Sequence, residues 1–269
     1  MFQRLTAHMP SANAPKDNLT HAFNNVSRGI GFIALALPLG CLLAGLIRFI
    51  PPSDIQDSIS HFYYTPIMGD FFVGCLFFNG ILLMFMFHTN GRPVSGWKRL
   101  SAWESILMRL TGFAAIMIAL FPTSGKSDSY GETELLRVFV QGEKGSALFQ
   151  IGDLSKLGGL SLHFVFAAFM FASLAYFTAC VFTRDHTTEL GTPESPATPN
   201  KLKRNRIYRV LGAAIAISIV AIGLGSTGTL ISEKSWDAFN GTFIFEGVAL
   251  VAFGLAWLIK GRFFKSLAD

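Results

Sequence analysis

Six long apolar segments constrain the fold of this chain more than any other feature. They cover residues 26–50, 66–88, 102–121, 158–182, 207–231 and 237–260. Each has about the 20 residues with which an α-helix, rising ~1.5 Å per residue, crosses ~30 Å of hydrocarbon. The sequence therefore predicts an all-α fold, an integral membrane bundle of six transmembrane helices.

The composition agrees with one membrane domain flanked by short tails. Hydrophobic residues make up 51% of the chain and charged residues 14%, and 27 of the 269 residues are phenylalanine, far from the balance of a soluble domain. We expect a polar N-terminal tail over residues 1–25, the membrane domain over residues 26–262, and a C-terminal tail over residues 263–269. The first segment has no cleavage pattern after it, so we expect it to stay as a signal anchor.

The distribution of positive charge predicts the orientation. A net charge of +5 would ordinarily suggest a nucleic-acid partner, but fifteen of the 22 lysines and arginines lie on one side of the predicted membrane. The positive-inside rule then places both termini in the cytoplasm, as expected for a protein of a bacterial inner (plasma) membrane. The expected partners are membrane lipids rather than nucleic acid, with the basic stretch 201–209 touching anionic headgroups. No oligomeric state is predicted.

Polar residues of the predicted outer face could form a site. Two histidines fall on this side among serines and a carboxylate, and the set is Ser58, Ser60, His61, Asp70 and His163. Two imidazoles and the Asp70 carboxylate would suit a divalent metal such as zinc. Alternatively, a histidine could activate Ser58 or Ser60 as a nucleophile. Alternatively, these residues have a structural role, in which Asp70 interacts with the helix dipole and the histidines bind no ligand.

A second polar set lies deeper in the predicted membrane. Glu246 falls nine residues into the sixth segment and Arg109 seven residues from the inner end of the third. Isolated charges are expensive there, so we expect both to face the interior and pair, with Asn79 at a similar depth. The pair would either fix helix register or line a proton or substrate pathway.

Two further patterns give local predictions. The sequence Gly223-Leu-Gly225-Ser-Thr-Gly228 matches a dinucleotide fingerprint but lies within a membrane segment, so we expect a close-packing or kinking site instead. Residues 132–140 of the long outer loop mix charged and apolar residues at helical spacing. They predict a short interfacial helix.

Several segments resemble a widespread, uncharacterised family of bacterial multi-spanning membrane proteins, and more distantly the Frag/DRAM/Sfk group of six-span proteins. They are residues 58–65, Phe72-Val-Gly74, 119–123, Leu162-His163, 173–177 and 253–261. This resemblance implies a role in lipid remodelling or phospholipid organisation. The chain is also weakly similar to alkaline ceramidase-like membrane hydrolases through Ser58 or Ser60, His61 and Asp70. It lacks their late HxxxH zinc pair, since no histidine follows His186.

Together these patterns favour a membrane protein with an outer-face polar pocket that binds lipids or acts on them by remodelling or hydrolysis. One alternative is a transporter or channel with Asn79, Arg109 and Glu246 as its polar core. The other is a non-enzymatic protein that organises or senses lipids.

Overall fold

The computed structural model describes residues 14–47, 55–86, 100–123, 137–140, 147–150, 156–157, 160–184, 198–229 and 231–268. The long helices are α1 (Ala14–Ile47), α2 (Pro66–Phe85), α3 (Ala102–Leu120), α4 (Leu162–Tyr176), α5 (Pro199–Ser226) and α7 (Gly241–Lys260). Shorter elements are the 3₁₀-helices η1 (Ile59–Tyr64) and η5 (Lys265–Leu267), the π-helical turn η4 (Phe177–Val181) that ends α4, and α6 (Glu233–Ala238).

The predicted six-helix membrane fold is confirmed. Six helices are long and apolar enough to span a membrane, over Thr20–Ile47, Ile67–Phe85, Ala102–Leu120, Leu162–Val181, Pro199–Ser226 and Gly241–Lys260. Local signals set several of their starts. Ser101 and Thr198 accept hydrogen bonds from backbone N–H groups in the first turns of α3 and α5, and Pro66 opens α2.

Two local predictions are corrected. The sixth span begins at Gly241 rather than at residue 237, because α6 ends first and Asn240 adopts a left-handed conformation with φ 54°. In the outer loop, residues 137–140 are a strand rather than a helix, while residues 132–136 lie outside the described residues. That strand, β1 (Arg137–Val140), pairs in parallel with β2 (Ala147–Gln150), and β3 (Lys156–Leu157) pairs antiparallel with β4 (Leu160–Ser161).

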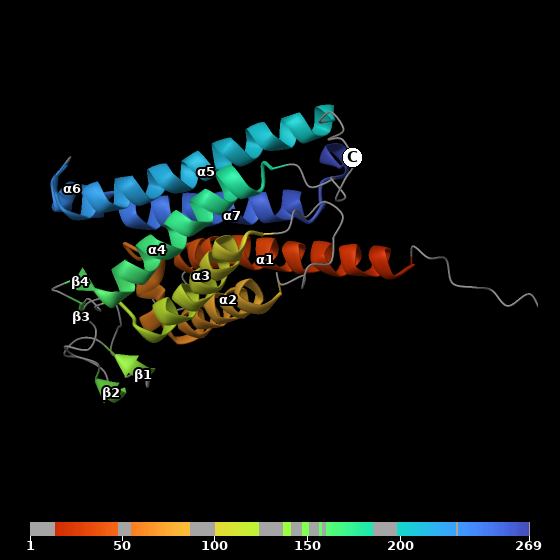
Figure 1. The fold of residues 1–269 in the computed structure, drawn as a ribbon. Helices are drawn as coiled ribbons and strands as arrows, with labels where there is room; N and C mark the ends of the chain where they lie inside the picture. The colour runs from red at the N-terminus through yellow and green to blue at the C-terminus, as the bar shows by residue number, and fades with distance from the viewer. Residues whose placement is uncertain are drawn as a thin grey trace, which may run out of the picture.

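The long helices form a closed ring in the order α1, α2, α3, α4, α5, α7, with α7 packed back against α1. The chain's C-terminus and the start of α1 lie at one end of the bundle, which we call the termini end (Figure 1). The opposite end, where α6 lies, also carries η1, and we call it the cap end.

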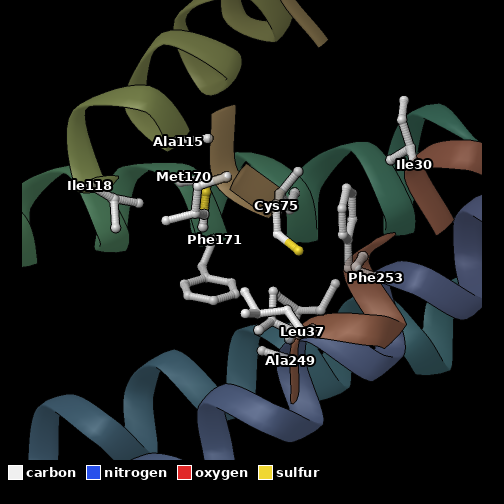
Figure 2. Packing of buried hydrophobic residues seen from close by; sticks show 14 of the residues in the cluster. Ile30, Leu37, Cys75, Ala115, Ile118, Met170, Phe171, Ala249 and Phe253 are labelled. Atoms are coloured by element: carbon white, nitrogen blue, oxygen red, sulfur yellow. The ribbon is translucent and has the colours of Figure 1, made fainter. Parts of the chain in front are cut away.

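Apolar side chains from several helices fill the ring. Leu37 of α1, Cys75 of α2, Phe171 of α4 and Phe253 of α7 meet in its interior (Figure 2). Many large apolar side chains, such as Leu43, Phe85 and Val210, are exposed on the helices instead. In lipid these outward side chains are solvated by acyl chains, so helix association depends on close packing rather than on exclusion of water.

Glycines permit that close packing. A Cβ added at Gly31 of α1 would lie 2.8 Å from the carbonyl oxygen of Gly254 in α7, and one at Gly254 would lie 2.9 Å from the oxygen of Gly31. Gly80 of α2 and Gly112 of α3 approach each other in the same way. Small residues thus bring backbones together at two of the ring's contacts.

Within the glycine-rich pattern at residues 223–228, Gly225 is a close-packing site, whereas a Cβ added at Gly223 would meet nothing within 4 Å. The buried indole of Trp236 in α6 lies where a Cβ on Gly225 or Gly241 would be, and its Nε1 donates to Thr242 Oγ1 at 2.8 Å. The indole therefore packs between the C-terminal end of α5 and the N-terminal end of α7.

We predict that Gly31→Ala lowers the stability of the bundle by about 1 to 3 kcal/mol, because the added methyl group meets backbone and forces α1 away from α7. Thermal unfolding in neutral detergent measures this. Gly29→Ala is the matched control, since a Cβ there meets nothing within 4 Å. Its gain in helix propensity should leave stability unchanged or raised by up to about 1 kcal/mol. Equal losses in both variants would contradict the packing role.

Candidate functional site

The candidate site is built around η1, which lies between α1 and α2 in sequence and packs against α1, α2 and α7. Ser58 begins it by accepting a hydrogen bond from the backbone N–H of Ser60 at 3.1 Å. Five of its six residues are buried, including Ile59, Phe62 and Tyr63. Apolar side chains thus hold this short helix in the cap end and carry the polar side chains of Ser58 and Ser60 inside with them.

Glu246 fixes the start of η1. It lies five residues after the start of α7, or about 7.5 Å along the helix, so it is nearer the cap end than the predicted segment bounds indicated. Its Oε2 accepts the Ser58 hydroxyl at 2.8 Å and the backbone N–H of Ile59 at 2.7 Å. Hydrogen bonds to a carboxylate are among the stronger ones, so this side chain ties α7 to η1.

His163 reaches η1 from the opposite side of the ring. It is buried in the first turn of α4, and its Nδ1 lies 2.9 Å from the carbonyl oxygen of Phe121, just beyond α3. A carbonyl oxygen only accepts, so Nδ1 carries the proton. In the neutral ring Nε2 is then an acceptor, and it lies 3.0 Å from the hydroxyl oxygen of Ser60.

Two more hydrogen bonds tie η1 and its approach to the helix ends. The hydroxyl of Tyr64 donates to the carbonyl oxygen of Thr123 beyond α3, and the backbone N–H of Phe243 in α7 donates to the carbonyl oxygen of Asp57 at 2.9 Å. Together with Glu246 and His163, these bonds connect η1 to segments that are far apart in the chain.

The structure therefore brings part of the predicted outer set together. Ser58, Ser60 and His163 share one hydrogen-bonded network, and its carboxylate is Glu246. The Ser60 hydroxyl is 3.5 Å from Glu246 Oε1 and closer to the imidazole. His61 is partly buried and within electrostatic range of His163. Asp70 is exposed on α2.

These side chains do not assemble the predicted three-residue metal site. Across the residues that the structure describes, no three or more His, Cys, Asp or Glu side chains are grouped so that they could hold a metal ion. His61, His163 and Asp70 are all described, so they form no such group. The spacing of the network suits proton transfer between a hydroxyl and an imidazole instead.

The expected pair of Arg109 and Glu246 is corrected. Arg109 is exposed on α3, and the hydrogen bonds of Glu246 within the described residues run to η1. A helical side chain leans toward the helix N-terminus, which for Arg109 is the nearer membrane boundary, so a long arginine can direct its charge there. Asn79 lies on α2, and its Oδ1 is buried with no hydrogen-bond partner among the described residues.

A second polar cluster, at the termini end, joins α3 to α4. The buried carboxylate of Glu104 completes a capping box with Ser101, forms an ion pair with Arg184, and accepts the Tyr176 hydroxyl at 3.2 Å. The Ser-x-x-Glu signature at residues 101–104 could have identified the cap, but not the partners from α4. Because the Glu104 carboxylate has partners from both segments, this cluster, which we call the clasp, links α3 to the end of α4 and the residues after it.

No known protein family, curated protein or solved structure matches this chain.

We predict that Glu246→Ala destabilises η1 while the six long helices stay packed together. The change leaves the Ser58 hydroxyl and the Ile59 N–H without their acceptor, which destabilises by about 1 to 3 kcal/mol. Hydrogen exchange should rise over residues 58–64 and stay unchanged in the middle of α3. Glu233→Ala, an exposed carboxylate at the same end, is the control.

A double-mutant cycle on Glu246 and Arg109 tests the correction to Arg109. Because the two side chains do not pair, the losses in Glu246→Gln and Arg109→Met should add to within about 0.5 kcal/mol in the double variant. If the double variant were instead more stable than the single variants, the two side chains would form an ion pair and the correction would be wrong.

Proposed function

We propose that this protein is a membrane-embedded serine hydrolase that acts on the acyl ester or amide of a lipid, with Ser60 as nucleophile and His163 as general base. The observation that supports it is the 3.0 Å contact between Ser60 Oγ and His163 Nε2, with His163 Nδ1 at 2.9 Å from a backbone carbonyl. A nucleophile beside a base that a third group orients is the arrangement such catalysis needs.

The chemistry follows from this geometry. Ser60 Oγ attacks the acyl carbonyl carbon while its proton passes to His163 Nε2. The tetrahedral intermediate then expels the alcohol or amine, which takes that proton from His163 and leaves an acylated Ser60. A water molecule, deprotonated by His163, releases the carboxylic acid and regenerates the serine. Phe121 keeps the proton on Nδ1, and Glu246 holds η1 so that Ser60 faces the imidazole.

The surroundings of the cap end favour a lipid as substrate. Exposed apolar side chains of four spans lie near this end, and they are Leu46, Ile67, Phe164 and Ile244. Acyl chains can pack against such side chains while the headgroup linkage reaches η1. Glu246 is partly exposed as a residue, whereas Ser60 and His163 are buried, with 8% and 2% of their surfaces exposed.

The transporter alternative has less support. It needed a polar core of Asn79, Arg109 and Glu246, whereas Arg109 is exposed and Glu246 bonds to η1. A non-enzymatic lipid-binding role would use the same cap end without a reactive serine. Labelling of that serine separates the two readings.

Ser60 should react covalently with a fluorophosphonate probe in membranes. We expect Ser60→Ala and His163→Ala to abolish the labelling, the first by removing the nucleophile and the second by removing its base. Ser218→Ala is the matched control, because Ser218 is also buried and, among the described residues, its hydroxyl donates to the Ala214 carbonyl of its own helix rather than to a histidine. It should label like the wild type.

Two outcomes would contradict the hydrolase proposal. One is a folded wild-type protein that neither fluorophosphonate nor β-lactone probes label. The other is labelling that persists in Ser60→Ala. In either case a non-enzymatic lipid-binding role of the cap end would be favoured over hydrolysis.

We further propose that the chain lies in a bacterial inner membrane with the cap end outside and both termini in the cytoplasm. In a variant whose three native cysteines are replaced, an impermeant thiol reagent applied to intact cells should label Glu233→Cys but not Lys265→Cys. Both positions are exposed, one at each end of the bundle. The reverse pattern would invert the orientation, and with it the side on which the hydrolase acts.

A further inference from the structure

Four cations gather at the termini end, opposite the candidate site. Lys201 and Arg204 lie near the start of α5, Lys260 is the last residue of α7, and Arg262 follows it. Lys260 has the other three as electrostatic neighbours. Lys201 and Lys260 are each only 8% exposed, which is unusual for lysine. We call these four residues the basic cluster.

Hydrogen bonds to the backbone hold the cluster in place. Arg28 of α1 donates to the carbonyl oxygens of Gly261 at 2.7 Å and Arg262 at 3.2 Å. Arg204 donates to the carbonyl oxygen of Leu267, so α5 holds the segment that follows α7. The C-terminal segment is thereby fixed between α1 and α5, with the basic residues of α5 and α7 side by side.

Arg262 lies just beyond the end of α7 in a left-handed backbone conformation. Its φ is 53°, in the left-handed region where glycine is favoured and side chains are disfavoured. The backbone N–H groups of Phe263 and Arg262 donate to the carbonyl oxygens of Leu258 and Ile259, each at 3.0 Å, which is a helix-ending motif where glycine is the commonest residue at this position. The hydroxyl of the buried Tyr208 lies within electrostatic range of Arg204 and Arg262, which adds a neutral donor to the cluster.

We propose that the basic cluster binds a phosphate group, such as the one in the headgroup of an anionic phospholipid. The guanidinium groups of Arg204 and Arg262 supply paired N–H groups, which match phosphate oxygens. Beside them lie Lys201, which also donates to the carbonyl oxygen of Arg184 at 2.8 Å, and Lys260, whose Nζ lies 5.4 Å from the centre of the Phe182 ring. Arg204 and Arg262 are partly buried, which reduces the screening of their charges by salt when an anion enters.

The cluster differs from the other basic residues of the same helix. Lys203, Arg206 and Arg209 are exposed on α5 and can serve as a general attraction to anionic membrane surfaces. They provide matched controls, because each variant removes one positive charge from one helix.

The test titrates purified protein in neutral detergent at about 0.15 M salt, where exposed charges are screened. The probes are dioctanoyl phosphatidylglycerol, dioctanoyl phosphatidylcholine and inorganic phosphate, with affinity read from the rise in melting temperature. Phosphatidylglycerol should stabilise the wild type, and Lys260→Gln and Arg204→Gln should weaken its binding by about tenfold or more. Arg206→Gln and Arg209→Gln should change it by less than about threefold.

The Arg262→Gly variant distinguishes an effect on lipid binding from an effect on the stability of the fold. Glycine suits the backbone at this position, so the unliganded variant should melt at or above the wild-type temperature, while its affinity for phosphatidylglycerol falls. A merely structural arginine would instead lower the melting temperature and leave affinity unchanged.

The remaining outcomes are equally decisive. If inorganic phosphate stabilises the wild type and displaces the lipid, the source is soluble phosphate and the site stands. If neither phosphatidylglycerol nor phosphate binds, or phosphatidylcholine binds as well as phosphatidylglycerol, the proposal fails. It fails also if Arg206→Gln and Arg209→Gln lose as much affinity as the cluster variants.

Discussion

The carboxylate of Glu246 holds the cap end together. One of its oxygens accepts the Ser58 hydroxyl and the Ile59 N–H, which are the groups that the start of a short helix leaves without partners. A 3₁₀-helix of six residues has little stability of its own, and here it stays formed because its start is bonded to a neighbouring span. The orientation of Ser60 toward His163 depends on that anchor.

The two ends of the bundle use polar groups differently. At the cap end, hydroxyl, imidazole and carboxylate groups form one chain of hydrogen bonds around η1, which is suited to moving a proton. At the termini end, Glu104 and Arg184 are satisfied within a clasp, while the basic cluster concentrates positive charge beside it. Between them the interior is packed with apolar side chains, so these features are separated along the bundle axis.

The sequence predicted the spans because a 20-residue apolar run has few other solutions. The ring order could not be read, since lipid-facing and interior residues are both apolar, as Leu43 and Leu37 illustrate. Ser60 and His163 belong to the outer-face set that the sequence suggested could converge, and they share a hydrogen bond, but Glu246 takes the place expected for Asp70. Glu246 was assigned to the wrong set because the sixth helix starts four residues later than its hydropathy indicates, after Asn240. Arg109 was misplaced because the reach of a long side chain is not visible in hydropathy.

Closure of the ring gives the protein a fixed order of maturation. Helix α1 packs against α7, and η1 is synthesised well before α7, which supplies Glu246. Ser60 and His163 can both be in the membrane before that, yet the bonds that anchor η1 form only after α7 has been synthesised. A ribosome that stops before α7 thus releases five spans in which Glu246 is missing, so the hydrogen-bonded network around η1 is complete only in chains that include α7.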